Sequence, residues 1–234
     1  MREGLVITGA SKGIGFATAK RFLAQGARVV NLSRTRCELA GVLNLTVDLS
    51  LPGFERSVEA ALLEAISNCE RLVLVHNAYM MERDTADSGS PDVLRRSLEV
   101  QLVAPAILNR MLIPKMGSGS SIVYVGSTLS EKAVAGVFSY VVAKHAVVGM
   151  MRATCQDLLG RGIHTVCICP GVTDTETLRK RVGGDEAVFE TLRSMTGEGR
   201  LIEPDEIAQV IAFAAAQPVL NGTVIHANLG QKEH

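Results

Sequence analysis

Tyr140 and Lys144 are the two residues of this chain whose types and spacing best suit proton transfer. They stand four residues apart in an amphipathic stretch, so a helix there would place both side chains on one face, one turn apart. An ammonium beside a phenol favours the phenolate, which predicts a lowered pKa for Tyr140. Such a phenol can give a proton to a substrate oxygen and take it back in the reverse direction. A tyrosine–lysine pair at this spacing is also common in plain helix packing.

Ser127 is a candidate for the same chemistry because of its place in the chain. It follows the strand-like run Ser121–Val125, and open parallel α/β folds bind ligands at the carboxyl ends of their strands. A serine hydroxyl at that edge can hold a substrate oxygen as negative charge develops on it. We therefore predict that Ser127, Tyr140 and Lys144 form one acid/base set.

A glycine-rich loop lies between the first apolar run and the first amphipathic stretch. Its spacing, Gly-x-x-x-Gly-x-Gly, differs from the general dinucleotide fingerprint Gly-x-Gly-x-x-Gly. Glycines let the backbone turn sharply and bring N–H groups close to a pyrophosphate, at the positive end of the following helix. A plain tight turn is the alternative, but the strand before and the helix after favour a dinucleotide site. The residues predicted to bind the cofactor here are Gly9, Ser11, Lys12, Gly13, Ile14 and Gly15.

The segment 31–36, at the end of the second apolar run, should meet the adenosine ribose. NAD sites usually have an acidic residue there to bind the 2′-hydroxyl, whereas this segment reads Asn-Leu-Ser-Arg-Thr-Arg. Arg34 is suited to pair with a 2′-phosphate, Ser33 to hydrogen-bond to it, and Lys12 to add a second positive charge. The segment predicts NADP(H) rather than NAD(H), although solvated surface cations would look the same.

Short apolar runs alternate with longer amphipathic stretches along the whole chain. Runs rich in Val, Ile and Leu are typical of strands buried on both faces of a parallel sheet. The predicted strands are Leu5–Thr8, Arg28–Leu32, Leu43–Val47, Leu72–Val75, Ser121–Val125, His164–Ile168 and Val224–His226. The predicted helices are Gly15–Ala24, Phe54–Ile66, Pro91–Met111, Ser139–Leu159 and Pro204–Ala215. This alternation predicts an α/β fold: a Rossmann-like, doubly wound parallel sheet with helices on both faces.

We expect a single domain over residues 1–234, because this length suits one α/β domain and no linker or repeat interrupts it. The segment Thr173–Gly199 is charged and glycine-containing, with only a weak helical period around Glu186–Met195. A long segment of this kind after a strand is more often a lid or binding loop than a linker. We predict a substrate lid at about residues 173–199.

Composition argues against several classes of protein. Lysine plus arginine and aspartate plus glutamate number 24 each, so no field of one sign favours nucleic acid or a membrane surface as a partner. No apolar run is long enough to span a bilayer and no secretion signal is recognisable, which predicts a cytoplasmic protein. The five cysteines lack disulfide or metal-site spacing, so we predict reduced thiols and no metal. Cys167 and Cys169 should point to one face of a strand.

Nearly the whole chain resembles the classical short-chain dehydrogenase/reductase family. The matching pieces are the loop Thr8–Gly15, Asp48-Leu49, Asn77-Ala78, Ser127 thirteen residues before Tyr140-x-x-x-Lys144, and Pro170-Gly171 followed by Thr173 and Thr175.

The resemblance also implies roles for these residues. Asp48, with Leu49 beside it, would bind the adenine amino group, and Asn77, with Ala78, would steady the sheet next to the cofactor. The Pro170–Thr175 segment, through Pro170, Gly171, Thr173 and Thr175, would hold the nicotinamide carboxamide. Lys144 would bind the nicotinamide ribose while tuning Tyr140.

Two positions depart from the family pattern. Tyr79 stands where the family usually has glycine, so it crowds the nicotinamide ribose, forms a wall of the substrate pocket, or packs against the following loop. Gln101 replaces an asparagine that supports a proton relay from the lysine through water; its longer side chain would either keep that water or displace it. His145 should face away from Tyr140, and His76 is expected to be structural.

These features predict an oxidoreductase that moves a hydride between NADP(H) and a small alcohol or carbonyl compound. The predicted catalytic residues are Ser127, Tyr140, Lys144 and Gln101. One alternative is a dinucleotide-binding sensor with little catalysis, which Tyr79 and Gln101 motivate. Another is reduction of an activated C=C bond, which the Ser-Tyr-Lys set disfavours. The resemblance implies a homodimer or homotetramer, paired through the apolar stretches Pro91–Met111 and Ser139–Leu159.

Overall fold

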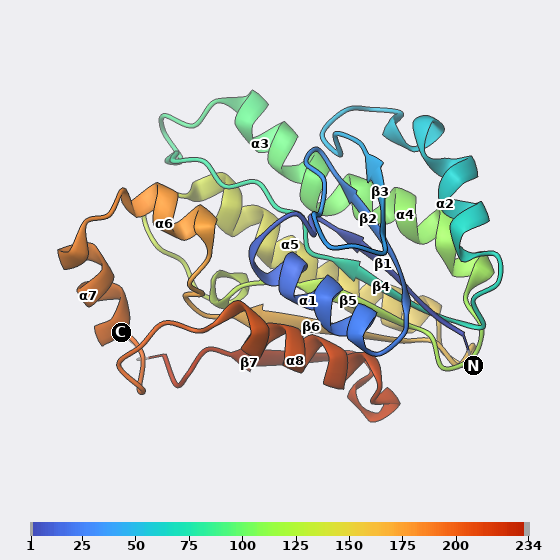
Figure 1. Cartoon of the computed structure of the whole chain (residues 1–234). Helices are drawn as coiled ribbons and strands as arrows, with labels where there is room; N and C mark the ends of the chain where they lie inside the picture. The colour runs from blue at the N-terminus through green and yellow to red at the C-terminus, as the bar shows by residue number, and fades with distance from the viewer. Residues whose placement is uncertain (1, 232–234) are drawn as a thin grey trace.

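The computed structural model describes residues 2–231 and contains one seven-stranded parallel sheet (Figure 1). Its strands are β1 Glu3–Thr8, β2 Arg28–Ser33, β3 Val42–Thr46, β4 Arg71–His76, β5 Ser121–Val125, β6 His164–Pro170 and β7 Thr223–Ala227. Their order is β3-β2-β1-β4-β5-β6-β7. All seven predicted strands are confirmed, with ends that differ by at most two residues.

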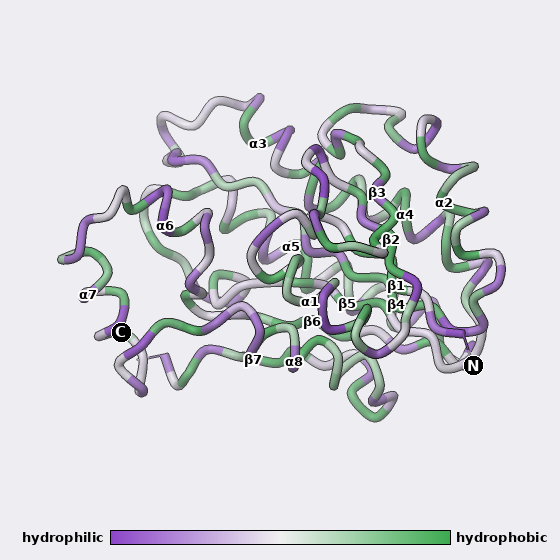
Figure 2. Tube along the Cα trace, viewed as in Figure 1, coloured by the Kyte–Doolittle hydropathy of each residue, from purple (hydrophilic) through white to green (hydrophobic). Residues whose placement is uncertain are grey.

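The strands are apolar on both faces because a hydrophobic cluster lies on each side of the sheet. Along β1, Val6 belongs to one cluster, whereas Leu5 and Ile7 belong to the other. Hydrophobic residues gather on the central strands, while many of the outer turns are polar (Figure 2). This double burial is what the near-continuous apolar runs in the sequence indicate.

Helices cover both faces of the sheet. Those that flank it are α1 Gly13–Ala24, α2 Glu59–Ile66, α4 Ala104–Leu112, α5 Phe138–Asp157 and α8 Pro204–Ala215. On one face α1 packs against α8, and Phe22 and Ile211 join the same cluster. On the other face α2, α4 and α5 contribute Leu62, Leu108 and Met151. The doubly wound arrangement is thus confirmed. No helix within residues 2–231 is both long and apolar enough to cross a membrane.

The stretch Pro91–Met111, predicted as one helix, is divided in the structure. α3 Pro91–Leu98 leads into a wide π turn, η2 Glu99–Val103, and then into α4. Pro105 lies just after the turn; it lacks an N–H donor, and its ring would crowd the carbonyl of Gln101, four residues earlier, in a regular helix. The π turn therefore contains Gln101, a predicted catalytic residue; π turns often occur at functional sites.

Several short 3-10 turns complete the chain. The predicted helix Phe54–Ile66 begins as one of them, η1 Phe54–Ser57, before α2 starts. Others are η3 Ile113–Lys115, η4 Thr128–Ser130 and η5 Pro218–Leu220.

The segment predicted as a lid, residues 173–199, contains two short helices. α6 Glu176–Val182 and α7 Glu186–Ser194 lie at one end of the molecule, far from the N-terminus (Figure 1). Each has a side-chain cap: Thr175 Oγ1 accepts from Leu178 N at 3.2 Å, and Asp185 Oδ1 accepts from Ala187 N at 3.0 Å. The weak helical period near α7 is confirmed, whereas α6 was not predicted.

Parallel pairing brings the carboxyl ends of β1, β4 and β5 to one edge of the sheet. β1 lies between β2 and β4, so the chain changes its direction of progress across the sheet at this point. Open α/β sheets bind ligands at such a switch point. The glycine loop, Asn77 and Ser127 follow the carboxyl ends of β1, β4 and β5, respectively.

Candidate active site

Ser127 and Tyr140 lie together at the carboxyl edge of the sheet. Ser127 follows β5 as the N-cap of η4, and Tyr140 is in the first turn of α5. The Ser127 side chain lies close enough to the Tyr140 phenol to lower the pKa of that phenol. Ser127 is itself held, because its Oγ accepts from Leu129 N at 3.1 Å and its N donates to Ser130 Oγ at 3.1 Å. Two hydroxyls thirteen residues apart are thus available to one substrate oxygen.

Lys144 is buried one helical turn after Tyr140. It is 3% exposed, and its Nζ donates to the carbonyl oxygen of Val125 at 2.7 Å. Nζ lies 5.6 Å from the ring centre of Tyr140 and 5.8 Å from that of Tyr79. Burial lowers the pKa of Lys144 to about 8, because desolvation penalises the ammonium.

The pKa of Tyr140 shifts opposite to the direction predicted from the sequence. Burial raises it most, and Tyr79 and Cys169 raise it further; the Ser127 side chain and the positive charge of Arg181 only partly oppose that rise. Lys144 does not reverse it, because the ammonium is directed at Val125 and lies beside the tyrosine ring. The expected lowering is therefore wrong. Tyr140 stays a neutral proton donor at ordinary pH, which suits reduction.

Asp84 fixes the start of α5, a role that the sequence analysis missed. It is buried, and its carboxylate accepts hydrogen bonds from Ser139 N at 3.1 Å and from Ser139 Oγ. In the backbone, Asp84 N donates to Gly136 O at 3.1 Å and Phe138 N donates to Asp84 O at 3.2 Å. Ser139 directly precedes Tyr140, so this clamp sets the position of the phenol. Nothing in the polar loop around Asp84 marks it as buried.

Gln101 is buried in the π turn with half of its amide satisfied. Its Nε2 donates to Ser97 Oγ at 2.9 Å and to Met80 O at 3.2 Å. Its Oε1 has no hydrogen-bond partner within the described residues. A buried acceptor of this kind is costly unless something binds it, so Oε1 is suited to hold a water molecule.

The glycine loop has the geometry that a dinucleotide site requires. Gly9 and Gly13 have positive φ angles of 74° and 57°, which glycine adopts without strain. A Cβ on Gly15 would lie 2.2 Å from the Gly9 carbonyl oxygen, so α1 approaches the loop too closely for any side chain. Asn77 ties the loop to β4, because its Nδ2 donates to the carbonyl oxygens of Thr8 at 2.9 Å and Gly9 at 3.0 Å.

Other residues of the predicted cofactor set surround this loop. Ser11 and Ile14 are half-buried, and Lys12 is exposed at the N-cap of α1. Ala78 N donates to Thr8 Oγ1 at 2.9 Å.

Asn31 supports the loop from β2 and was also missed as a site residue. Its Oδ1 accepts from Ala10 N at 2.9 Å, and its Nδ2 donates to Ser33 Oγ at 3.0 Å. Asn31 thereby links the glycine loop to the predicted ribose segment. The signal in the sequence was a polar amide inside an apolar strand, since buried amides need partners.

Arg34 and Asp48 lie near each other beyond the ends of β2 and β3. Burial raises the pKa of the Asp48 carboxyl, but hydrogen bonds from Ser50 and the charge of Arg34 outweigh it and hold the pKa below its usual range. Arg34 is exposed, Ser33 is half-buried and Leu49 is buried. The structure thus brings the predicted adenosine residues together.

The segment after β6 is fixed by its own backbone. Pro170 ends β6, and Gly171 N donates to Ala227 O at 3.0 Å in the neighbouring β7. Thr173 is buried, and its Oγ1 donates to Gly171 O at 3.1 Å.

The segment predicted as a lid touches the glycine loop through Thr175 and Glu176. A Cβ on Gly13 would lie 3.0 Å from Thr175 Cγ2. Glu176 Oε2 accepts a hydrogen bond from Gly13 N at 3.2 Å. The Glu176 carboxylate therefore binds the Gly13 amide, which the sequence predicts to bind the pyrophosphate of the cofactor.

Tyr79 lines the same site as Tyr140. The two ring centres are 6.0 Å apart with planes at 68°, an edge-to-face arrangement. The Tyr79 side chain is 44% exposed. It packs against the acid/base pair and leaves part of its ring open to a ligand.

The remaining candidates are structural. The Sγ atoms of Cys167 and Cys169 are 3.8 Å apart and free, which confirms that they share one face of the strand. His76 Nε2 pairs with Asn109 Oδ1 at 2.9 Å, and burial lowers the pKa of His76 to about 4. His145 is exposed. In the described part of the chain no cluster of His, Cys, Asp or Glu side chains could hold a metal ion.

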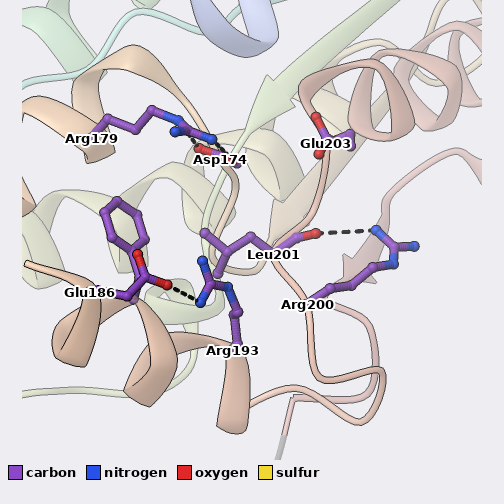
Figure 3. A pocket seen from close by; sticks show the side chains of 8 residues that line it. Asp174, Arg179, Glu186, Arg193, Arg200, Leu201 and Glu203 are labelled. Carbon is purple, nitrogen blue, oxygen red and sulfur yellow. Dashed lines mark hydrogen bonds and ion pairs between the residues drawn. The ribbon is translucent and has the colours of Figure 1, made fainter. Parts of the chain in front are cut away.

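A hollow of about 230 Å³ is lined partly by residues of the segment 173–199 (Figure 3), and neither Ser127, Tyr140 nor Lys144 lines it. Its lining is Asp174, Arg179, Glu186, Phe189, Arg193, Arg200, Leu201 and Glu203. Each of its arginines pairs with an acid; the pairs are Arg179–Asp174, Arg193–Glu186 and Arg200–Glu206. The charges neutralise one another, so this hollow does not provide an anion site.

The chain matches known proteins over almost its whole length. Residues 9–232 match the family model described as enoyl-(acyl carrier protein) reductase. The granaticin polyketide synthase putative ketoacyl reductase 1 of Streptomyces violaceoruber is 30% identical over 90% of this chain and 85% of that protein. The chain belongs to the short-chain dehydrogenase/reductase family.

Solved structures of this family superpose closely. The ligand-free aldohexose dehydrogenase of Thermoplasma acidophilum has a TM-score of 0.89 and 27% identity, over 98% of this chain and 94% of that one. A short chain dehydrogenase of Burkholderia cenocepacia in complex with NADP has a TM-score of 0.86 and 27% identity, over 97% and 96%. The chain is therefore an oxidoreductase of a family that uses nicotinamide cofactors.

The residues present fit such a cofactor. Gly15 allows close approach of α1 to the loop, and a loop amide already binds the carboxylate of Glu176, which shows that an anion is accepted there.

Proposed function

We propose that this short-chain dehydrogenase/reductase uses NADP(H) to reduce a ketone to a secondary alcohol, or to catalyse the reverse oxidation. One observation carries the proposal. The Ser127 side chain acts on the Tyr140 phenol at the carboxyl edge of the sheet, two strands from the strand that bears the glycine loop, and Lys144 is buried beside the Tyr140 ring.

Ser127 and Tyr140 would divide the work on the substrate oxygen. Ser127 Oγ accepts from Leu129 N, so the hydroxyl keeps its own proton, which it would donate to the carbonyl oxygen when a substrate is bound. Tyr140 gives its proton to the same oxygen. The bound cofactor supplies the hydride to the carbon. In the oxidation Tyr140 must be deprotonated before it can take the proton back, and burial disfavours this phenolate, because it raises the pKa of Tyr140.

Lys144 would resupply the proton and bind the nicotinamide ribose. Its pKa of about 8 lets Nζ bind or release a proton near working pH. Gln101 Oε1, the unpaired acceptor in the π turn, would orient a water molecule on the path from Lys144 to solvent. The longer glutamine thus takes the part that the family gives to asparagine.

The cofactor preference rests on charge. Arg34 and Lys12 are exposed cations beside the predicted 2′-phosphate position, and segment 31–36 has no acid to repel it. The other cofactor-binding residues would take the roles predicted for them: the loop Gly9–Gly15 would bind the pyrophosphate, and, as the family resemblance implies, Asp48 would bind adenine and Pro170–Thr175 the carboxamide.

The test is the consumption of NADPH against a panel of ketones. We expect turnover, a lower KM for NADPH than for NADH, and a loss of roughly a hundred- to ten-thousand-fold in kcat for Tyr140→Phe. Tyr140→Phe should bind NADPH as tightly as the unaltered protein. Equal activity of Tyr140→Phe would overturn the role of the phenol.

A sensor with little catalysis is the second candidate. The packing of Tyr79 against both Tyr140 and Lys144 favours it, because the ring stands where the family has only glycine. Tight binding of NADPH without turnover of any ketone would support the sensor. The intact Ser-Tyr-Lys set favours carbonyl chemistry over reduction of a C=C bond.

Three broader features complete the proposal. The chain acts as one domain in which residues 173–199 close over the substrate. Pairs of chains associate through η2 and α5, where the large apolar side chains of Val103, Phe138 and Val142 are 37–40% exposed. The five free thiols suit the reducing cytoplasm. A monomeric mass by light scattering at micromolar concentration would contradict the association.

A further inference from the structure

Arg181 joins the lid to the loop that follows β4. It lies in the last turn of α6. Its Nη1 contacts Met81 Sδ at 2.9 Å, and its Nη2 donates to Met81 O at 3.2 Å. Met81 is two residues from Tyr79, which packs edge-to-face on Tyr140. The guanidinium therefore stands at the meeting point of the lid and the site.

No acid neutralises Arg181 within residues 2–231. The carboxylates closest along the chain to Arg181 or to Met81 include three with other partners: Asp174 pairs with Arg179, Glu82 with Arg96, and Glu176 binds Gly13 N. Arg181 instead uses a carbonyl oxygen and a thioether, which are weak partners for a cation. A guanidinium has five N–H donors, so most of its donors remain available for a further partner.

The charge of Arg181 reaches the reacting group. It opposes the rise in the pKa of Tyr140, whereas no carboxylate contributes to that pKa. The surroundings of the phenol thus combine the Arg181 cation with the exposed ring of Tyr79. No carboxylate acts on the phenol, and the groups that oppose Arg181 there are Tyr79 and Cys169. A substrate placed against Tyr140 and Ser127 meets positive charge on the lid side.

We propose that the substrate is a carbonyl compound that bears a carboxylate, and that Arg181 binds this carboxylate while Ser127 and Tyr140 hold the carbonyl oxygen. This inference rests on the proposed reductase function. Planar guanidinium and carboxylate groups pair through two parallel hydrogen bonds, which fix orientation as well as affinity. The Arg181–Met81 contact holds the cation in place, so that little order is lost on binding. Tyr79 would form the wall along the carbon chain between the two polar ends.

The test compares acids with their neutral esters. The probes are short linear oxo-carboxylates, in which the carbonyl stands next to the carboxylate or one, two or three carbons away, and their methyl esters. We expect at least one acid to exceed its ester in kcat/KM by roughly tenfold or more, as a charge-assisted contact provides. The ratio removes any effect of Arg181 on Tyr140, because that effect is shared by both substrates.

Three variants locate the preference. Arg181→Gln should lower the acid-to-ester ratio by roughly tenfold or more, and Arg181→Lys should retain part of it, since a point charge lacks the bidentate fork. Lys180→Gln removes the same charge from the adjacent, exposed position of α6 and should leave the ratio unchanged. Added salt should lower kcat/KM for the acid more than for the ester in the unaltered protein.

The outcomes separate this inference from the proposed function. Turnover of both acids and esters with a ratio that Arg181→Gln does not change overturns the role of Arg181 and leaves the reductase standing. No turnover of any ketone overturns both. Thermal unfolding of Arg181→Gln should match that of Lys180→Gln. If Arg181→Gln is less stable, the test is the unaltered protein: an equal effect of salt on kcat/KM for acid and ester overturns the binding of the carboxylate by Arg181.

Discussion

Lys144 is the residue at which chemistry and stability conflict most directly. Its folded-state pKa is about 8, below the usual 10.5. Below pH 8 the lysine is protonated in both folded and unfolded chains, and the folded chain carries a desolvated ammonium. Between pH 8 and 10.5 only the unfolded chain holds the proton, so this group makes the free energy of unfolding rise with pH. The difference between the two pKa values corresponds to a rise of roughly 3 kcal/mol in the free energy of unfolding across this pH range.

Lys144→Met should therefore stabilise the fold while it removes activity. Methionine has a similar length and no charge to desolvate, so we expect the unfolding free energy at pH 7 to rise by roughly 1–3 kcal/mol, since repacking takes part of the gain. The gain should shrink as the pH rises from 8 to 10.5. Urea unfolding at several pH values measures both. A variant less stable than the parent at pH 7 would refute this account of the buried ammonium.

At the residue scale, the sequence predicts identities better than environments. Ser127, Tyr140 and Lys144 could be predicted to lie at one edge of the sheet because of their types and spacing. The direction of the Tyr140 pKa could not, because burial depends on which other segments pack around the phenol. Asp84 was missed for the same reason, since its burial arises from contact with Ser139 far along the chain.

At the scale of elements, the hydrogen bonds between Asp84 and Ser139 fix the loop after β4 to the first turn of α5. Asp84→Asn keeps the shape of the side chain but replaces one acceptor with a donor that faces Ser139 N or Oγ. We expect a loss of about 1–3 kcal/mol in stability. Because the phenol shifts, kcat should fall by roughly ten- to a hundredfold.

The effect should fall on kcat rather than on the Kd for NADPH, because the glycine loop is held separately by Asn77 and Asn31. Asp87→Asn is the matched control: it is exposed in the same loop and accepts from Thr85 Oγ1. If Asp84→Asn and Asp87→Asn lose the same activity, Asp84 has no positioning role.

The contact between α6 and α1 is a second link between elements. Glu176 occupies the amide of Gly13 and would place negative charge beside a pyrophosphate. Glu176→Gln should therefore tighten NADPH binding by roughly three- to tenfold, because it removes a competing anion and a like charge at the helix N-terminus. Titration of NADPH fluorescence measures the Kd. Glu198→Gln, also exposed in the lid segment, should leave it unchanged; weaker binding by Glu176→Gln would contradict the competition.

Helices and strands with a clear hydrophobic period in the sequence could be predicted. Elements whose shape depends on contacts with other segments could not. α8 begins at Pro204 and ends at Ala215, as predicted. The π turn arises from Pro105 acting on a helix that otherwise reads as regular, and α6 is too short to show a period of its own. Its stability comes from the Thr175 cap and from its contacts with the loops beside it.

At the scale of the whole molecule, the topology follows from the alternation of apolar and amphipathic segments. A parallel sheet that is buried on both faces needs strands that are apolar throughout, and right-handed crossovers leave few other arrangements. The sequence could not show that the segment predicted as a lid contacts both the glycine loop and the loop after β4. The bonds Gly13–Glu176 and Met81–Arg181 join segments about a hundred residues or more apart.

Those distant bonds make the site a property of the complete fold. The glycine loop comes from the first residues of the chain, the predicted acid/base set from its middle and the segment 173–199 from its last third, and none of them is held in place by local sequence alone. A ligand that bridges these parts recognises only the chain in which all of them are assembled. Its binding energy is added to the stability of the entire molecule, so cofactor concentration governs how long the enzyme survives heat and proteolysis as well as how fast it works.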